Sequence, residues 1–267
     1  MTSLILPAFN PGATIVPTWH AVERFLVAQA RQGDPWEALL VLDGCTDDTA
    51  QRVAALARPP SRIRVLSYPI NRGKGFAVRT GLLAARGSIR IFTDVDLAYP
   101  FEDVLRVAAT LRSGAAVAIG SRTHPASRIQ VATTALGYAL RRTIQGRLFG
   151  ALARRLLPID HHDTQAGLKG LTAEAAERLV PHLSCDGFEF DCELLTACAC
   201  AGIAVVEVPV CVRYTSAAST TGLWSGLQMV AALWRIRRRW RNSIVSGLVP
   251  GPLPRPGAPV PQLPTAA

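Results

Sequence analysis

Two aspartates one residue apart follow a short apolar segment in the first half of the chain. Asp94 and Asp96 come directly after Ile91-Phe92-Thr93, and an apolar run of this length predicts a buried strand. Open α/β sheets bind ligands at the carboxyl ends of their strands, where unpaired carboxylates would be costly to bury. A cation such as Mg²⁺ takes carboxylate and phosphate oxygens together, so the pair could hold a metal and a diphosphate. A solvated turn is the alternative for this tripeptide alone.

The composition predicts a folded protein with an anionic partner. A chain of 267 residues can form one large α/β domain or two small ones. Apolar residues make up 49% of it and charged residues 18%, which allows a sizeable core and excludes wholesale disorder. The formal charge of +10 indicates a nucleotide, a phospholipid surface or a nucleic acid as partner.

Cysteine usage and the start of the chain predict a cytoplasmic protein. None of the six cysteines has the paired spacing of a zinc site, and residues 1–3 show no sign of a signal peptide. We therefore expect reduced, buried thiols. No apolar run approaches the roughly 18–20 residues of a membrane span. The longest, Leu223 to Trp234, is followed by Arg235, so membrane contact is expected to be peripheral.

The first 122 residues alternate between strand and helix patterns. Apolar strands are expected at 4–6, 39–42, 63–66, 89–92 and 116–119, and helices at 17–31, 47–57, 75–86 and 101–112. Strands separated by helices and short connections pair in parallel. The sequence therefore predicts an α/β fold with a doubly wound, mostly parallel sheet and helices on both faces.

Two later segments, near 131–157 and 223–241, predict basic amphipathic helices. Leucine or isoleucine recurs every fourth residue in the first, and tryptophans lie beside arginines in the second. Such helices suit a membrane surface, although helices packed on the domain with solvated arginines would show the same pattern. We expect a single domain over residues 1–245 and a disordered tail at 246–267, which contains seven prolines.

Polar residues follow four of the expected strands, and parallel strands bring such residues to one edge of the sheet. Together they would place acids, an aromatic ring and an arginine in one cleft, as a nucleotide-diphosphate site needs. A turn and a helix cap explain the second segment equally well by itself. The four segments are Pro7–Asn10, Asp43–Thr49, Asp94–Asp96 and Gly120–Arg122.

A glycine-rich segment lies between the third and fourth expected strands. Lys74 stands between Gly73 and Gly75 just before a predicted helix. Backbone amides and a cation could approach a phosphate there. A tight turn is the alternative, since the spacing is neither that of a P-loop nor that of a dinucleotide-binding fingerprint.

In this order the segments resemble the successive signatures of family 2 glycosyltransferases. Asp163–Lys169, Phe188–Leu195 and Val206–Val210 are similar to the dolichyl-phosphate β-glucosyltransferase branch, and the resemblance covers residues 3–241. It implies a GT-A fold. It also implies inverting transfer of a hexose from a nucleotide-diphosphate sugar, with a UDP-sugar favoured, to a polyprenyl or dolichyl phosphate at a membrane surface.

The resemblance also implies roles for individual residues. Lys74 and Arg122 would neutralise phosphate charge. The residues implied to bind the nucleotide sugar are Pro7, Phe9, Asn10, Asp43, Lys74, Asp94 and Arg122. Asp94 and Asp96 would engage Mg²⁺ or Mn²⁺. The residues implied to face the sugar or the acceptor, and so to form the catalytic group, are Asp163, Gln165 and Asp191.

Two main alternatives remain at this point, besides a sugar nucleotidyltransferase on a related fold, whose characteristic glycine-rich N-terminal loop is missing here. A hydroxyl acceptor would need a general base, with Asp163 or Asp191 as candidate, whereas an acceptor phosphate is already ionised and needs alignment. The segment 216–221 lacks the lysine that the family usually has there, which favours the hydroxyl. The second alternative is a non-catalytic basic module that binds lipid or nucleic acid. It is disfavoured because the aspartates would repel phosphate without a metal, so no nucleic-acid partner is expected.

Overall fold

The computed structural model describes residues 1–57, 62–132, 136–214 and 223–242. The predicted tail at 246–267 and the segment 216–221 lie outside the described residues. Within the described parts of the chain, no helix is both long enough and apolar enough to cross a membrane.

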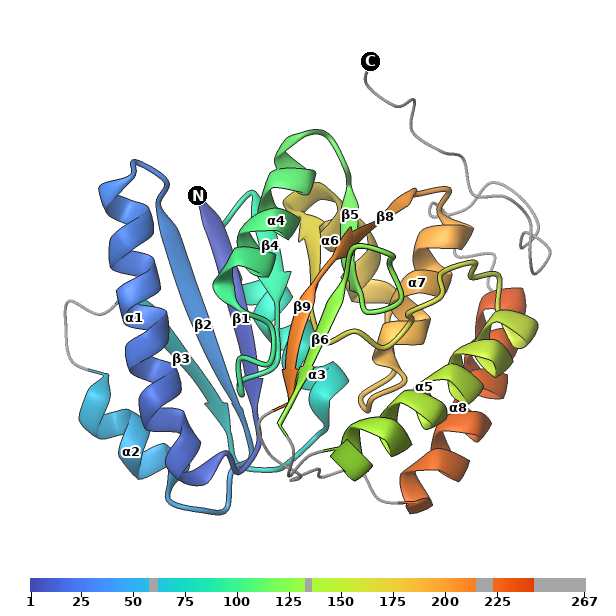
Figure 1. Ribbon diagram of the computed structural model, residues 1–267, viewed down its shortest axis with the longest axis horizontal. Helices are drawn as coiled ribbons and strands as arrows, with labels where there is room; N and C mark the ends of the chain where they lie inside the picture. Colours follow the sequence, from blue (N-terminus) through green and yellow to red (C-terminus); the bar gives the residue numbers. More distant parts are fainter. Residues whose placement is uncertain (58–61, 133–135, 215–222, 243–267) are drawn as a thin grey trace.

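The principal sheet has seven strands in the order β3-β2-β1-β4-β7-β5-β8 (Figure 1). The bounds are β1 Thr2–Ala8, β2 Trp36–Asp43, β3 Ile63–Tyr68, β4 Ile89–Phe92, β5 Val117–Ser121, β7 Lys169–Thr172 and β8 Val205–Pro209. A second, two-stranded sheet pairs β6 Arg128–Val131 with β9 Cys211–Tyr214. All five predicted strands are confirmed. In the principal sheet β7 alone runs antiparallel to its neighbours, β4 and β5.

The four predicted helices between the strands are also confirmed. The helices are α1 Ile15–Arg31, α2 Thr49–Leu56, α3 Lys74–Ala84, α4 Phe101–Arg112, α5 Leu136–Leu156, α6 Ala173–Leu179, α7 Phe190–Cys200 and α8 Leu223–Asn242, with 3₁₀ turns at Gly12–Thr14 and Val180–His182. The basic segments form α5 and α8. The predicted start of the first at 131 is wrong, because Val131 pairs with Tyr214 as the last residue of β6.

The core lies on both faces of the sheet because successive side chains of a strand point to opposite sides. Ile5 faces the layer of α3, α6, α7 and α8, whereas Leu4 and Leu6 face α1 and α4. A parallel strand covered on both sides reads as a continuous apolar run, which is why β1 and β2 are buried along their whole lengths.

The orientation of β7 shapes one edge of the sheet. Lys169, its first residue, lies opposite Phe92 of β4 and Ile119 of β5. The carboxyl ends of β4 and β5 therefore meet the amino end of β7. The loop of residues 163–168 enters the same edge as the polar segments that follow β1, β2, β4 and β5.

The glycines around Lys74 let two loops pass close together. Gly73 has a φ of +103°, which favours glycine, and a Cβ there would lie 2.4 Å from the Asp186 carbonyl oxygen. A Cβ at Gly75 would lie 2.5 Å from the Cys185 carbonyl oxygen. These contacts explain both glycines by backbone packing.

The packing at Gly75 gives a stability prediction. We expect Gly75→Ala to lower the free energy of unfolding by about 1–3 kcal/mol, because backbone has to shift to admit the methyl group. Gly146→Ala in α5 is the matched control: a Cβ there meets nothing within 4 Å, so it should be neutral or stabilise by up to about 1 kcal/mol. Urea denaturation measures both, and equal stabilities of the two variants would contradict the packing argument.

Candidate active site

The loops after β1 and β2 are joined by the Asn10 side chain. Its Oδ1 accepts hydrogen bonds from the backbone N–H groups of Thr46 (2.8 Å) and Asp47 (3.3 Å). The Asn10 backbone is left-handed, with a φ of 48°, a conformation that asparagine tolerates well. The neighbouring Phe9 side chain is exposed, whereas Pro7 is buried within β1. Asn10 thus shapes the edge beside an aromatic ring open to solvent.

Asp43, at the end of β2, is buried and holds the loop that leads into α3. Its carboxylate accepts hydrogen bonds from the backbone N–H groups of Arg72 (2.8 Å) and Gly73 (2.9 Å) and from Asn71 Nδ2 (3.1 Å). Buried polar groups need such partners. Asp43 therefore fixes the position of Lys74, the first residue of α3.

Lys74 reaches across to the aspartate after β4. Its Nζ lies 2.5 Å from Asp94 Oδ1. Gly167 packs against the other oxygen, since a Cβ at Gly167 would lie 2.0 Å from Asp94 Oδ2. Asp96 is exposed, and its Oδ1 accepts from the Ala98 backbone N–H at 3.1 Å. The structure thus brings Lys74, Asp94 and the 163–168 loop together.

Asp163, which is buried, forms an ion pair with the partly buried Arg122. Arg122 Nε and one terminal nitrogen each lie 2.7 Å from an Asp163 carboxylate oxygen, and the Arg122 backbone N–H donates at 2.8 Å. Burial would raise the pKa of the Asp163 carboxyl, but the hydrogen bonds and charge of Arg122 outweigh it and hold that pKa below its ordinary value.

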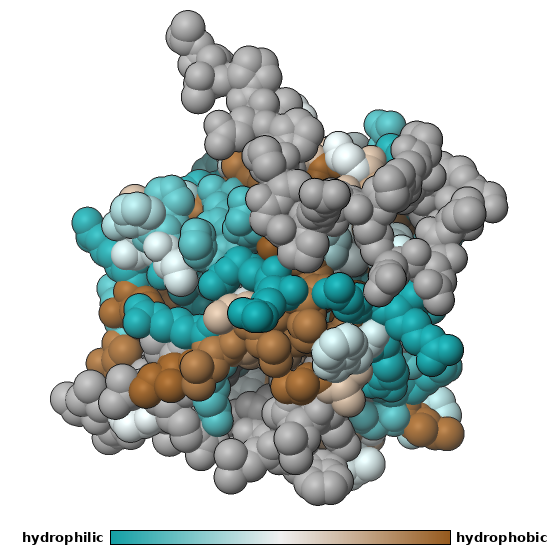
Figure 2. All heavy atoms as spheres, turned by 90° about the vertical axis from the view of Figure 1, so that its right-hand side faces the viewer, coloured by the Kyte–Doolittle hydropathy of each residue, from teal (hydrophilic) through white to brown (hydrophobic). Residues whose placement is uncertain are grey.

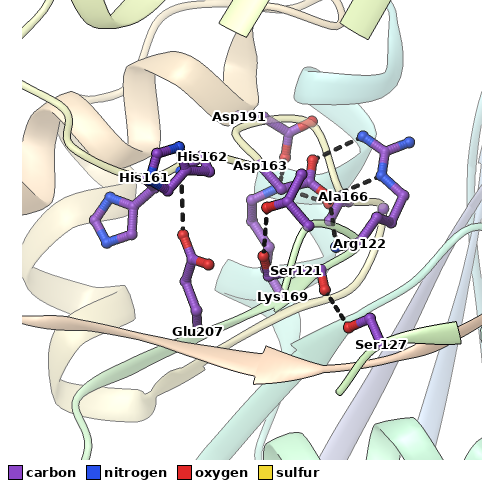
Figure 3. A network of polar contacts seen from close by, with 12 residues as sticks. Ser121, Arg122, Ser127, His161, His162, Asp163, Ala166, Lys169, Asp191 and Glu207 are labelled. Atoms are coloured by element: carbon purple, nitrogen blue, oxygen red, sulfur yellow. Dashed lines mark hydrogen bonds and ion pairs between the residues drawn. The ribbon is translucent and has the colours of Figure 1, made fainter. Parts of the chain in front are cut away.

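Asp191, at the start of α7, pairs with a fully buried cation, Lys169. The Lys169 Nζ lies 2.7 Å from Asp191 Oδ1 and donates to the Ala166 carbonyl oxygen at 2.6 Å, and its side chain is fully buried. Figure 3 shows this pair beside Arg122 and Asp163. Lys169 was missed among the predicted site residues. No signal in the sequence indicated it, because β7 was not predicted, and a lysine is known to require a partner only once its strand is known to be buried.

Other residues of the 160–168 segment stand apart from these pairs. His161 Nε2 lies 3.4 Å from the Val205 carbonyl oxygen. The His162 backbone N–H donates to Glu207 at 3.2 Å, as Figure 3 shows. Gln165, half-buried, lies in the same loop as Asp163. Among the described residues no cluster of three or more His, Cys, Asp or Glu side chains could hold a metal by itself.

An α/β sheet whose strand ends carry these carboxylates and cations has the architecture of nucleotide-binding enzymes. Residues 3–180 match the family model described as glycosyl transferase family 2, and the chain belongs to this family. It is therefore a glycosyltransferase.

Curated relatives extend the match beyond the family model. The chain is 32% identical over 216 residues to a dolichyl-phosphate beta-glucosyltransferase of Trichomonas vaginalis, a match that covers 78% of this chain and 63% of the relative. It is 30% identical over 246 residues to a dolichyl-phosphate beta-glucosyltransferase of Dictyostelium discoideum, covering 89% of this chain and 74% of the relative.

Solved structures support the GT-A fold. Glucosyl-3-phosphoglycerate synthase of Mycobacterium tuberculosis, crystallised with Mn²⁺, UDP and phosphoglyceric acid, superposes with a TM-score of 0.59 at 21% identity. The match covers 92% of this chain and 80% of that one. The predicted α/β GT-A architecture and family are therefore confirmed.

The Asp163–Arg122 pair gives a pH prediction. Because the folded-state pKa of Asp163 is lowered, its contribution to stability is complete above the unfolded pKa, near 4, and is lost as the pH falls through the folded pKa. We expect Asp163→Asn to be less stable than the unsubstituted protein by about 3 kcal/mol between pH 5 and 7. The difference should shrink below about pH 4.

Urea denaturation across this pH range measures the difference. Asp48→Asn is the control, since Asp48 forms an exposed ion pair with Arg52 and its removal should change stability little at every pH. A difference for Asp163→Asn that stays the same down to pH 3 would contradict the lowered pKa.

Lys169 gives a second stability prediction. We expect Lys169→Met to lower the free energy of unfolding by about 3–5 kcal/mol, because Asp191 is left buried without its cation. The double variant Lys169→Met/Asp191→Leu should recover much of that loss, since it removes both charges. Thermal and urea unfolding of the single and double variants test this, and a double variant less stable than Lys169→Met would contradict it.

Proposed function

We propose that this chain transfers a hexose, with inversion, from a nucleotide-diphosphate sugar to a polyprenyl or dolichyl phosphate at the cytoplasmic face of a membrane. A UDP-sugar is the favoured donor, and Mg²⁺ or Mn²⁺ is the proposed cofactor. The names of the curated relatives support the lipid-phosphate acceptor. The neighbouring crystal structures that contain UDP with Mn²⁺ or Mg²⁺ support the donor and the metal.

The main support for a phosphate acceptor is that both candidate general bases, Asp163 and Asp191, are already held by cations. Asp163 is bound on both oxygens by Arg122, with a lowered pKa, and Asp191 is paired with a fully buried lysine. A general base works best when its pKa lies near the working pH, and the lowered pKa of Asp163 takes it away from that range. Asp191 is poorly placed to accept a proton from a hydroxyl because its Oδ1 is already held by Lys169. A phosphate acceptor needs no such proton transfer, because it is ionised at neutral pH. Its oxygen needs alignment with the donor.

The residues after β4 fit a divalent cation shared with a diphosphate. Mg²⁺ commonly keeps several waters and is held by one or two carboxylates together with substrate phosphates, which agrees with two aspartates and no larger ligand cluster in the described residues. Asp94 and Asp96 would hold it. The bound metal would act as a Lewis acid and stabilise the leaving nucleoside diphosphate.

The remaining roles follow from what the side chains do in the fold. Phe9 exposes 43% of its surface beside the Asn10 loop and could stack on the nucleoside base. Asp43 fixes the backbone that presents Lys74, and Lys74 can offset phosphate charge next to Asp94. Gln165 and the two ion pairs would position the sugar and the acceptor. In this scheme the protein orients two anions and moves no proton.

A donor and acceptor panel tests the proposal. We expect transfer from a radiolabelled UDP-hexose to a short polyprenyl phosphate in Mn²⁺ or Mg²⁺, and loss of transfer in EDTA. Asp94→Asn and Asp96→Asn should each lower the rate at least about 100-fold, since even outer-shell partners of a metal contribute up to that factor. Glu174→Gln is the matched control, since Glu174 is an exposed carboxylate just beyond the carboxyl end of antiparallel β7 and so lies at the edge of the sheet opposite to Asp94.

Thermal shift of the same variants gives a readout independent of turnover. UDP with Mn²⁺ should raise the unfolding midpoint of the unsubstituted protein and of Glu174→Gln, but not that of Asp94→Asn. Transfer only to a hydroxyl acceptor would overturn the acceptor assignment. If Asp94→Asn and Asp96→Asn both kept the transfer rate and the metal dependence of the unsubstituted protein, the proposed metal site would be wrong.

A further inference from the structure

We propose that the outward face of α5 and α8 is the surface by which this protein binds an anionic lipid bilayer. The inference deepens the proposed function, on which it rests for its lipid substrate, by naming where the enzyme meets the membrane. The α5–α8 face consists of two rows of exposed side chains, one on each helix. The spacing of these side chains, their charge and the packing of the helices behind them support the proposal. The rows are Ile144, Arg147, Leu148, Ala151 and Arg155 on α5, and Ala231, Trp234, Arg235 and Arg238 on α8.

The first row lies along one side of α5. Its residues are three, four, seven and eleven positions from Ile144, the spacing that places side chains on one helix face. Leu148 is 68% exposed and Ile144 51%. Covering large aliphatic side chains that have this much contact with water by an apolar phase lowers the free energy of the system. Arg147 and Arg155 flank them along the same face.

The second row has the same composition on α8. Trp234 is 58% exposed, and the Arg237 guanidinium lies 6.0 Å from its ring centre. Arg235 and Arg238 are exposed beside it. Tryptophan next to arginine is the pairing typical of the bilayer interface, where the indole ring takes the headgroup level and the arginines bind lipid phosphate.

The two helices form one anchored surface. α5 and α8 lie side by side at the right of Figure 1, and an Arg237 guanidinium nitrogen donates to the Leu156 carbonyl oxygen at 2.8 Å. Their inner sides, including Leu233 and Trp240, are buried in the core. The exposed apolar residues are thus held outward by helices whose other sides are already packed.

The positive charge of the two helices indicates that the α5–α8 face binds an anionic surface. α5 and α8 each contain five arginines and neither contains an aspartate or glutamate. Figure 2, which faces this side of the molecule, shows a band of apolar atoms bordered by hydrophilic ones. A nucleic acid would match the arginines but would leave Leu148 and Ile144 uncovered, whereas an interfacial bilayer site covers both kinds of side chain.

The α5–α8 face also borders the candidate active site. Arg235 lies 4.0 Å from Glu189, the residue that precedes α7 and stands two positions before Asp191. Buried Glu193 of α7 accepts from Trp240 Nε1 at 3.3 Å and from the backbone N–H groups of Ser184 and Cys185. The loop it holds is the one that packs against Gly73 and Gly75. A lipid bound on α8 would therefore be close to the elements that carry Asp191 and Lys74.

Vesicle sedimentation tests the surface. We expect the full chain to bind vesicles of phosphatidylcholine with 30–40% phosphatidylglycerol and to bind pure phosphatidylcholine weakly at about 0.15 M salt. Leu148→Asp and Trp234→Asp should each weaken binding at least about tenfold, since a charge replaces a side chain that enters the interface. Arg238→Ala should weaken it roughly fivefold, and Val27→Asp on α1, also an exposed apolar residue, should bind as the unsubstituted protein does.

Three outcomes would contradict the proposed membrane surface. They are equal binding to both vesicle types, unchanged vesicle binding by Leu148→Asp and Trp234→Asp, or a loss of vesicle binding in Val27→Asp as large as in those two variants. Unchanged thermal midpoints of the variants show that they fold. RNA binding that survives Leu148→Asp, with no vesicle binding, would replace the bilayer by a nucleic acid. Vesicle binding without sugar transfer from any donor would reject the proposed function and keep the surface, so the two failures are distinguishable.

Discussion

The arrangement of the candidate site depends on the buried ion pair between Lys169 and Asp191. It ties the first residue of β7 to the start of α7, and the same Lys169 nitrogen bonds the Ala166 carbonyl, so the preceding loop cannot move independently. That loop brings Gly167 against Asp94 and Asp163 against Arg122. Removing one partner of such a pair leaves a buried charge uncompensated, which costs more than the pair contributes when intact.

This organisation separates two kinds of carboxylate within one edge of the sheet. Asp163 and Asp191 are buried and held by fixed cations, so their charge is part of the scaffold. Asp94 and Asp96 follow the end of β4 and lie nearer solvent. Lys74, which contacts Asp94, is the first residue of α3 and follows a loop that Asp43 holds in place. A site of this kind favours chemistry driven by alignment and charge neutralisation over chemistry driven by proton transfer.

Much of the fold could be predicted from local patterns, and the site only in part. Apolar runs and helix punctuation predicted five parallel strands and four helices, because each signal lies within a few residues. The antiparallel strand β7 was not predicted, since four residues beginning with a lysine carry no strand signal. The pairs Arg122–Asp163 and Lys169–Asp191 join residues 41 and 22 positions apart, a juxtaposition that periodicity cannot reveal. The individual roles of the site residues remain predictions.

Several of the contacts that shape the site end on backbone amides. Asp43 bonds the N–H groups of Arg72 and Gly73, Asn10 that of Thr46, and Glu193 those of Ser184 and Cys185. An amide donor is present whatever side chain follows it, proline excepted. The geometry is thus set at the acceptor positions, and most donor positions can accept other side chains. Gly73 is an exception, because its φ of +103° and the Asp186 carbonyl require glycine there. Relatives could therefore diverge widely along these loops and retain the same backbone arrangement, so side chains there can change without loss of the scaffold.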